Sequence, residues 1–258
     1  MKLAGTRAVV TGASRGLGSA LATELAARGA RVVLVARSRE PLEKLAAEID
    51  GEAFPADLAD RTAIETVVAA IEAEGPIDVL VNNAGIDLTG GFTEAAADDI
   101  AQLIAVNLLA PMLLSRAVVP GMVRRGRGHI LNVSSLAGTN ALPGVTPYSA
   151  SKAGLSHFTA GLRADLKGTA VRTTLAEIGP VRGDMMDSLR SYEPTRRALE
   201  RLKTLQLQVD LEPRTVVLAL ADAIEGDRRH VRLPKRDVVF PLLVEMPRRV
   251  TELLLVGV

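Results

Sequence analysis

Tyr148 and Lys152 lie four residues apart in the segment YSASK, a spacing that can support proton transfer. On a helix, residues at this spacing share a face, so the lysine ammonium would lie near the tyrosine phenol. A nearby positive charge stabilises the phenolate and lowers the tyrosine pKa from its usual value of about 10. The pair could therefore act as a general acid and base, although an ordinary surface Tyr–Lys pair has the same spacing.

Ser14 belongs to a second segment that could do chemistry, because residues 12–16 read GASRG. This segment matches G-x-S-x-G, the turn that presents the nucleophilic serine of many hydrolases. It also lies within TGASRGLG, a glycine-rich turn of the type that binds the phosphates of a dinucleotide. Ser14 is a nucleophile in the first interpretation and a phosphate ligand in the second.

Short apolar or β-branched runs alternate with segments of helical period along the chain. The runs cover residues 8–10, 31–36, 77–83, 129–135, 171–178 and 230–234. Runs this apolar are typical of strands buried on both faces of a parallel sheet. Leu17, Leu21 and Leu25 recur every four residues and indicate an amphipathic helix. We predict a single Rossmann-type, doubly wound α/β domain over residues 1–258, with a mostly parallel seven-stranded sheet and helices on both faces.

The position of GASRG directly after the first run favours the dinucleotide interpretation. A hydrolase serine would need a histidine oriented by an acid. The chain has three histidines, His129, His157 and His230, and none of them has an evident acid in the sequence that would orient it. In the dinucleotide interpretation, Gly12 allows the tight turn, Gly16 opens the helix and Gly18 lets the helix approach the sheet. The positive end of that helix would face a pyrophosphate.

Five segments occur in a characteristic order and spacing: TGASRGLG (11–18), NNAG (82–85), VNLLAP with Asn107, NVSSLAG with Ser135, and YSASK (148–152). Together they resemble the classical short-chain dehydrogenase/reductase family, and the resemblance covers nearly the whole chain to about residue 182. It implies a Rossmann-type domain that binds a nicotinamide cofactor and interconverts carbonyls and alcohols by hydride transfer.

By this resemblance the catalytic tetrad is Asn107, Ser135, Tyr148 and Lys152. Tyr148 is then the acid and base, Ser135 hydrogen-bonds the substrate oxygen, and Asn107 holds a water chain to Lys152. The cofactor-binding residues implied are Gly12, Ser14, Arg15, Gly16, Leu17, Gly18, Arg37, Asp57, Leu58, Asn83, Ala84, Gly85, Tyr148, Lys152, Pro180 and Val181.

Two of these assignments have a structural alternative. Asp57 lies where the family binds the adenine amino group, but it could also cap the helix that follows. Asn83 belongs to a loop that would pack under the adenine ribose, but its side chain could simply connect neighbouring strands.

The residues after the second apolar run indicate which nicotinamide cofactor binds. An NAD site usually has an Asp or Glu there for the ribose 2′-hydroxyl, whereas this chain has Ala36 in that place and Arg37 next. Arg15 adds a second guanidinium from the glycine turn, and guanidinium groups match phosphate geometry. We predict NADP(H), against the alternative that both arginines are solvated surface charges.

The segment IGPVRG (178–183) departs from the family pattern P-G-x-V-x-T. Gly183 lacks the threonine hydroxyl that usually helps to fix the nicotinamide carboxamide. Cofactor orientation would then depend on backbone groups such as the Val181 amide.

Residues 183–210 are predicted to form a lid over the substrate. Met185, Met186 and Leu189 could line an apolar pocket, or could pack against the domain when the lid closes. We expect a small, fairly apolar ketone, aldehyde or alcohol as substrate. The basic residues of the lid could bind an anionic tail, but their helical spacing is more typical of a solvated face: Arg196, Arg197, Arg201 and Lys203.

The C-terminal segment, about residues 235–258, is longer and more apolar than a strand end requires. It contains apolar residues at helical spacing, Val250, Leu253 and Leu254, and two adjacent arginines, Arg248 and Arg249. The segment could pack on the lid or on a neighbouring subunit, or make a peripheral contact with an anionic membrane. The family resemblance implies a homodimer or homotetramer built on the helices that carry Asn107 and Tyr148.

Composition narrows the class of protein further. With 31 Lys and Arg against 30 Asp and Glu, the net charge of +1 provides no basic field for nucleic-acid binding. The absence of cysteine excludes disulfides, thiolate catalysis and cysteine-based zinc sites, and we expect no metal. We expect no segment long and uncharged enough to span a bilayer, and therefore a soluble, cytoplasmic protein.

Two classes of function remain. The first is an NADP(H)-dependent oxidoreductase for an apolar ketone, aldehyde or alcohol, with a 3-oxoacyl-thioester reductase as a variant. The second is a non-catalytic NADP(H)-binding sensor or scaffold. The four tetrad residues favour the enzyme, because a protein without turnover has no need of both the phenol and its ammonium neighbour.

Overall fold

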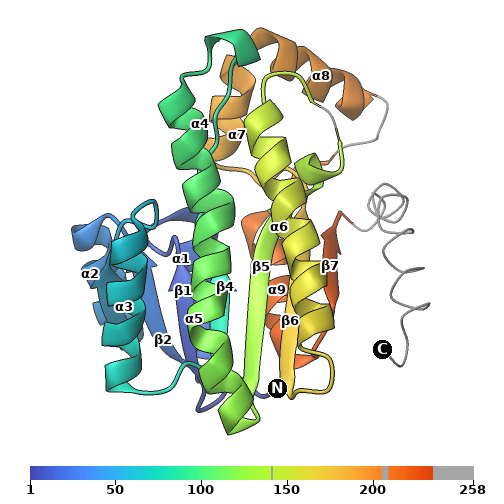
Figure 1. Cartoon of the computed structure of the whole chain (residues 1–258). Coiled ribbons are helices and arrows are strands. Elements are labelled where there is room, and N and C mark those ends of the chain that lie inside the picture. The colour runs from blue at the N-terminus through green and yellow to red at the C-terminus, as the bar shows by residue number, and fades with distance from the viewer. Residues whose placement is uncertain (141, 205–208, 235–258) are drawn as a thin grey trace.

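A parallel sheet of seven strands forms the centre of the molecule (Figure 1). The computed structural model describes residues 1–140, 142–204 and 209–234. The strand order is β3-β2-β1-β4-β5-β6-β7, and every neighbouring pair is parallel. The Rossmann-type, doubly wound α/β fold predicted from the sequence is confirmed.

Six of the seven strands coincide with the apolar runs of the sequence. They are β1 (Arg7–Thr11), β2 (Arg31–Ala36), β4 (Val79–Asn82), β5 (Gly128–Ser135), β6 (Val171–Ile178) and β7 (His230–Leu233). All five residues of β1 and all four of β4 are buried, as expected for central strands with helices on both faces.

The remaining strand, β3 (Glu52–Pro55), is absent from the predicted runs. It lies at the edge of the sheet and pairs only with β2. Its sequence, EAFP, contains a proline and no β-branched residue, and all four residues are only partly buried. An edge strand can accept such a composition because one side of its backbone needs no ladder partner.

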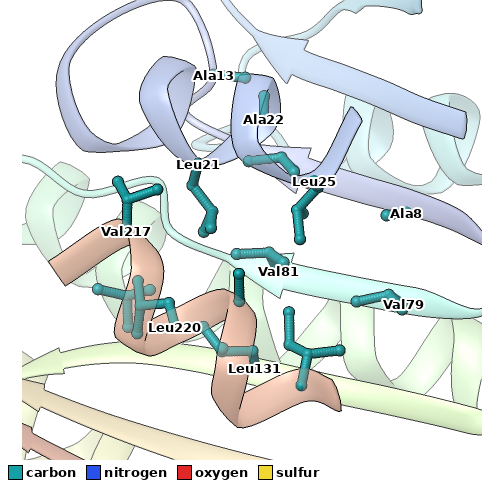
Figure 2. Close-up of a cluster of buried hydrophobic side chains, with 14 of the residues drawn as sticks. Ala8, Ala13, Leu21, Ala22, Leu25, Val79, Val81, Leu131, Val217 and Leu220 are labelled. Atoms are coloured by element: carbon teal, nitrogen blue, oxygen red, sulfur yellow. The ribbon is translucent and has the colours of Figure 1, made fainter. Parts of the chain in front are cut away.

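Helices cover both faces of the sheet. On one face lie α1 (Gly16–Ala27), α2 (Arg39–Ile49) and α9 (Pro213–Glu225), and on the other lie α3 (Arg61–Glu74), α5 (Ala110–Arg125) and α6 (Thr146–Asp165). Figure 2 shows Leu21 and Leu25 of α1 and Leu220 of α9 beside Val81 and Leu131 of the sheet. Full burial of such a side chain stabilises the fold by about 1.5–3 kcal/mol, so these contacts hold α1 and its preceding turn firmly in place.

The connections reverse direction at β1, which has β2 on one side and β4 on the other. In open α/β sheets this reversal opens a crevice at the carboxyl ends of the strands, where ligands bind. The turn at residues 12–15 and the segment at residues 83–85 follow β1 and β4, so both lie at this crevice.

Short elements stand over the carboxyl edge of the sheet. They are α4 (Ala97–Ile104), α7 (Asp184–Ser191), α8 (Glu193–Thr204) and the single turns η1 (Phe92–Glu94) and η3 (Leu136–Gly138). The Thr195 hydroxyl donates a hydrogen bond to the Pro143 carbonyl at 2.8 Å and thereby attaches α8 to the loop before α6. Residues 205–208 of the predicted lid and the whole predicted C-terminal segment 235–258 lie outside the described residues.

One helical stretch, Ala97–Arg125, is long and apolar enough to cross a membrane by length and composition alone. It contains α4, the π-turn η2 (Ala105–Leu109) and α5, and 44% of its most apolar window is buried. The expectation that no segment reaches this length and hydropathy is therefore wrong. Leu114 and Val118 of this stretch belong to the hydrophobic core on one face of the sheet.

Candidate active site

A cleft of about 1300 Å³ lies at the carboxyl ends of the strands. All the cofactor-binding residues implied by the resemblance line it, from Gly12 in the first turn to Val181 after β6. Ser135, Tyr148 and Lys152 of the expected tetrad line the same cleft. Asn107 does not line it, because its fully buried side chain lies behind Ile86. The fold thus brings together, in one cleft, residues that lie far apart in the sequence, from the first turn to the lid.

The glycine turn has the geometry that a close-fitting ligand site needs. Gly12 has φ +67°, and a Cβ there would lie 2.8 Å from the Ala84 Cα. A Cβ on Gly18 would collide with the Gly12 carbonyl oxygen and lie 2.5 Å from Asn83 Nδ2. Within the described chain no side chain caps the N-terminus of α1, and its first turn holds no acid. Its first N–H groups are therefore available to an anion.

The Asn83 side chain connects the neighbouring strands β1 and β4, which is the structural alternative to its role under the adenine ribose. Its Nδ2 donates to the Thr11 carbonyl at 3.0 Å, and the backbone N–H groups of Asn83 and Ala84 both donate to Thr11 Oγ1 at 3.0 Å. These bonds join the ends of β1 and β4 beneath the cleft. The amide side chain of Asn83 thus shapes the cleft floor.

The end of the cleft beside β2 and β3 has basic residues at two positions and an acidic residue at another. The last residue of β2 is Ala36, so this position has no carboxylate. The exposed side chains of Arg15 and Arg37 line the cleft nearby. Asp57 Oδ1 accepts a hydrogen bond from the Ala59 N–H at 2.9 Å, whereas Asp60 caps α3. The alternative in which Asp57 caps that helix is therefore wrong.

Asn107 is held by the π-turn η2 between α4 and α5. Its Oδ1 accepts from the Ile86 N–H and its Nδ2 donates to the Ile86 carbonyl, both at 2.8 Å. Nδ2 also lies 3.2 Å from Ser151 Oγ. A π-turn often occurs at a functional site, and here it positions an amide that fixes the loop after Gly85. The water chain from Asn107 to Lys152 stays a prediction.

Tyr148 and Lys152 share one face of α6, as their spacing predicts. The Lys152 ammonium lies 5.7 Å from the centre of the Tyr148 ring and donates to the Val133 carbonyl at 2.9 Å. The hydroxyls of Ser135 and Tyr148 are hydrogen-bonded to each other, and Ser135 Oγ also accepts from the Ala137 N–H at 3.1 Å. Phenol, hydroxyl and ammonium therefore form one cluster at the cleft.

The expected lowering of the Tyr148 pKa is wrong for this structure. The pKa of the phenol is raised from 10.0 to about 12: burial is the main cause, the hydrogen bond with Ser135 opposes it, and the negative charge of Asp87 adds to it. Burial also lowers the Lys152 pKa from 10.5 to about 8. Helical spacing predicted that the two groups are neighbours but carried no information on how completely both leave water.

The loop after β6 explains the departure at Gly183. Val181 forms a parallel bridge with Leu211, and the Leu211 N–H donates to the Pro180 carbonyl at 2.7 Å. Gly183 has φ +145° where α7 begins, a conformation that L side chains rarely adopt. A threonine at this position would be strained, so the backbone of this chain requires the glycine.

The lid elements supply an apolar wall to the cleft through Met185, Met186 and Leu189. The basic residues of α8 are mostly paired with acids: Arg196 and Arg197 with Glu193, Arg196 also with Glu200, and Lys203 with Asp210. This pairing agrees with the solvated face favoured from the sequence. Tyr192 does not line the cleft and packs against Gly144.

Several cleft residues were not predicted from the sequence. They are Ser38, Ile86, Asp87, Asn140, Leu142, Val145, Thr195, Leu199 and Leu202 among others. Ser38 had a local signal, because it follows Arg37 and directly precedes α2. The others lie in loops or on the lid, where only the three-dimensional arrangement shows which side chains meet.

The hydrolase interpretation of Ser14 receives no support. Ser14 lies at the carboxyl edge of the sheet, whereas His129 and His230 lie at the amino ends of β5 and β7. The Nε2 of His129 is hydrogen-bonded to Thr174 Oγ1 at 2.8 Å inside the sheet. Neither histidine can reach the Ser14 hydroxyl from the opposite edge.

Comparison with known proteins agrees with this geometry. The model of the short chain dehydrogenase family matches residues 6–194, more than half of the chain. A gluconate 5-dehydrogenase of Gluconobacter oxydans is 41% identical over 169 residues (63% of this chain, 66% of the relative). A ketoacyl reductase, HetN, of Nostoc is 40% identical over 179 residues (67% and 62%). An NADP-dependent 3-hydroxy acid dehydrogenase, YdfG, of Salmonella typhi is 40% identical over 186 residues (70% and 75%).

Two solved structures have the same fold. A metagenomic short-chain oxidoreductase in complex with NADP has a TM-score of 0.73 at 37% identity, covering 90% of this chain and 96% of its own. A short-chain dehydrogenase from Sphingobium yanoikuyae in complex with NADPH has a TM-score of 0.81 at 26% identity, covering 98% and 96%. The chain belongs to the short-chain dehydrogenase/reductase family. It spans just under two thirds of the first two curated relatives.

Proposed function

We propose that this protein is an NADP(H)-dependent oxidoreductase that interconverts a fairly apolar ketone or aldehyde and the corresponding alcohol. The observation that carries the proposal is that Ser135, Tyr148 and Lys152 line the same cleft as the glycine turn. A proton donor and a dinucleotide site in one cleft are what carbonyl reduction requires.

The residues of the cleft fit an NADP cofactor. Gly12 and Gly18 leave space that a Cβ would fill, and the uncapped N-terminus of α1 suits a pyrophosphate. Arg15 and Arg37 would hold the 2′-phosphate, and Asp57 would bind the adenine amino group. Bound NADP(H) would supply or accept the hydride. NADP-bound relatives of known structure support this choice of cofactor.

Tyr148 would transfer the proton to or from the substrate oxygen. With a pKa of about 12 the phenol is protonated at neutral pH, so it can donate its proton to an oxygen that gains negative charge. Ser135 would hydrogen-bond the same oxygen. Lys152, with a pKa of about 8, carries its positive charge at neutral pH and would stabilise the phenolate that remains. In these protonation states Tyr148 carries the proton that carbonyl reduction needs.

The alternative functions have weaker support. A 3-oxoacyl-thioester reductase is consistent with the similarity to a ketoacyl reductase, but the lid arginines that would meet an anionic carrier are paired with Glu193 and Glu200. A non-catalytic sensor would not need the cluster of phenol, hydroxyl and ammonium.

The proposal also includes a cytoplasmic homodimer or homotetramer. Leu109 and Val123 expose 44% and 40% of their surface on the helical stretch that carries Asn107, and such residues suit a contact with a second copy. The absence of cysteine suits a reducing compartment. The role of the segment 235–258, in packing or at a membrane, belongs to the same proposal.

Cofactor oxidation tests the proposal directly. A panel of ketones, aldehydes and 3-oxoacyl thioesters is assayed with NADPH and with NADH, and Tyr148→Phe serves as the blank. We expect turnover that prefers NADPH and falls by about 10²–10⁴-fold in Tyr148→Phe, which cannot supply the proton. Tight NADPH binding without turnover on any substrate would favour the sensor, and equal use of NADH would contradict the 2′-phosphate site.

A further inference from the structure

The loop that follows Gly85 carries a carboxylate, Asp87, which lines the cleft. The loop is fixed on both sides of this residue. Ile86 exchanges two hydrogen bonds of 2.8 Å with the Asn107 amide, and the Gly90 N–H donates to the Gly144 carbonyl at 3.0 Å. Asp87 therefore has a defined place in the cleft, although it belongs to a loop.

Asp87 has little internal compensation for its charge. Thr89 Oγ1 donates to Asp87 Oδ2 at 3.3 Å, and over residues 1–140, 142–204 and 209–234 no lysine or arginine forms an ion pair with it. Other acids near the lid differ, since Glu193 and Asp210 each pair with two basic side chains. A carboxylate that lines a cleft without a cation beside it can accept a charge-assisted hydrogen bond from a ligand, so a cationic ligand group is a reasonable partner for it.

The two chain neighbours of Asp87, Ile86 and Leu88, pack against the apolar cluster that includes Tyr148. Val145 and Tyr148 form a buried cluster against which Ile86, Leu142 and Leu189 pack. Apolar walls exclude water and strengthen the field of a charge in the cleft. The charge of Asp87 reaches the reacting end, because it raises the pKa of the Tyr148 phenol.

Over the described ranges, the basic residues that line the cleft form no ion pair with Asp87. Arg15 and Arg37 lie at the glycine turn and the end of β2, and Arg182 is paired with Glu212. The charged Lys152 ammonium donates its hydrogen bond to the Val133 carbonyl and forms no ion pair with Asp87. In the described part of the chain, Asp87 thus carries a negative charge that no ion pair offsets, next to the apolar residues Ile86 and Leu88.

We propose that Asp87 is a specificity-determining residue that favours ketones and alcohols with an ammonium group near the reacting carbon and disfavours those with a carboxylate. An ammonium would form a charge-assisted hydrogen bond with Asp87 while the rest of the substrate contacts the apolar walls. A carboxylate in the same place would face a like charge. This inference rests on the proposed oxidoreductase function and names its substrate class.

The test uses three aryl ketones on one carbon skeleton that differ only in bearing an ammonium, a neutral hydroxyl or a carboxylate. In the wild type we expect kcat/KM to be highest for the ammonium ketone and lowest for the carboxylate ketone. Asp87→Asn should lower the ammonium-to-carboxylate ratio by at least about tenfold, and change the hydroxyl ketone by less than about threefold. Asp87→Glu, which keeps the charge, should retain the wild-type order.

Asp98→Asn is the matched control, because Asp98 is an exposed residue in the first turn of α4 and its substitution removes the same charge. It should leave the ratio unchanged. A ratio that is the same in wild type and Asp87→Asn, with turnover intact, would overturn the role of Asp87 and leave the oxidoreductase standing. If no ketone is turned over, the dissociation constants of the same three compounds from the NADPH complex provide the same comparison.

Discussion

At the scale of single residues, burial moves the pKa values of Tyr148 and Lys152 away from their usual values in water. The Lys152 side chain is 4% exposed, and its pKa is lowered to about 8 because burial disfavours the ammonium. The unfolded chain binds this proton more tightly than the folded protein does. The charged lysine therefore lowers the stability of the fold below pH 8, and stability should rise with pH from about 8 to 10.5.

Lys152→Met should consequently make the protein more stable and inactive. The pKa difference corresponds to about 3 kcal/mol, and loss of the hydrogen bond to Val133 offsets about 1 kcal/mol of it. Urea unfolding at pH 7 should show a gain of roughly 1–2 kcal/mol in the free energy of unfolding, which shrinks as the pH approaches 10.5. Lys167→Met, on an exposed lysine, is the control. A less stable Lys152→Met at pH 7 would contradict the argument.

At the scale of elements, the glycine turn shows how a helix end becomes a binding site. Gly18 lies in the first turn of α1, and its missing side chain lets the helix approach the Gly12 carbonyl and Asn83. Gly18→Ala should force the helix away from the turn, lowering stability by about 1–3 kcal/mol and weakening NADPH binding.

Gly161→Ala in α6 is the matched control for that substitution. A Cβ there would meet nothing within 4 Å, so alanine should be neutral or stabilise the helix by up to about 1 kcal/mol. Thermal unfolding and NADPH fluorescence titration measure both effects. Equal behaviour of the two variants would show that the close approach at Gly18 is unimportant.

The elements also show how much could be predicted from the sequence. Apolar runs located the central strands because burial on both faces leaves a continuous signal, whereas the edge strand β3 has no such signal. Motif spacing placed Ser135, Tyr148 and Lys152 in one cleft. Motif spacing could not predict that the Tyr148 pKa is raised or that Asp87 lines the cleft. Both depend on how loops close over α6.

At the scale of the whole molecule, the two edges of the sheet have different roles. The carboxyl edge gathers the glycine turn, the cluster of Ser135, Tyr148 and Lys152, and the lid. The amino edge holds structural polar contacts, in which Asp78 accepts from the Arg7 N–H at 3.0 Å and pairs with Arg127. His129 lies at the same edge, fully buried at the start of β5, with its Nδ1 3.4 Å from Asp227.

Burial of His129 should make the whole fold sensitive to acid. Its pKa is lowered to about 4: burial is the main cause, the Asp227 carboxylate opposes the shift, and the N-terminal ammonium and Arg172 add to it. The unfolded chain binds the proton from about pH 6.5 downwards, so the free energy of unfolding should fall by up to about 3 kcal/mol between pH 6.5 and 4. Urea titrations across this range should show a shallower decline for His129→Gln, which can still hydrogen-bond Thr174, than for wild type. His157→Gln, on an exposed histidine of α6, should keep the wild-type slope. Identical slopes for all three proteins would assign the acid sensitivity to other groups.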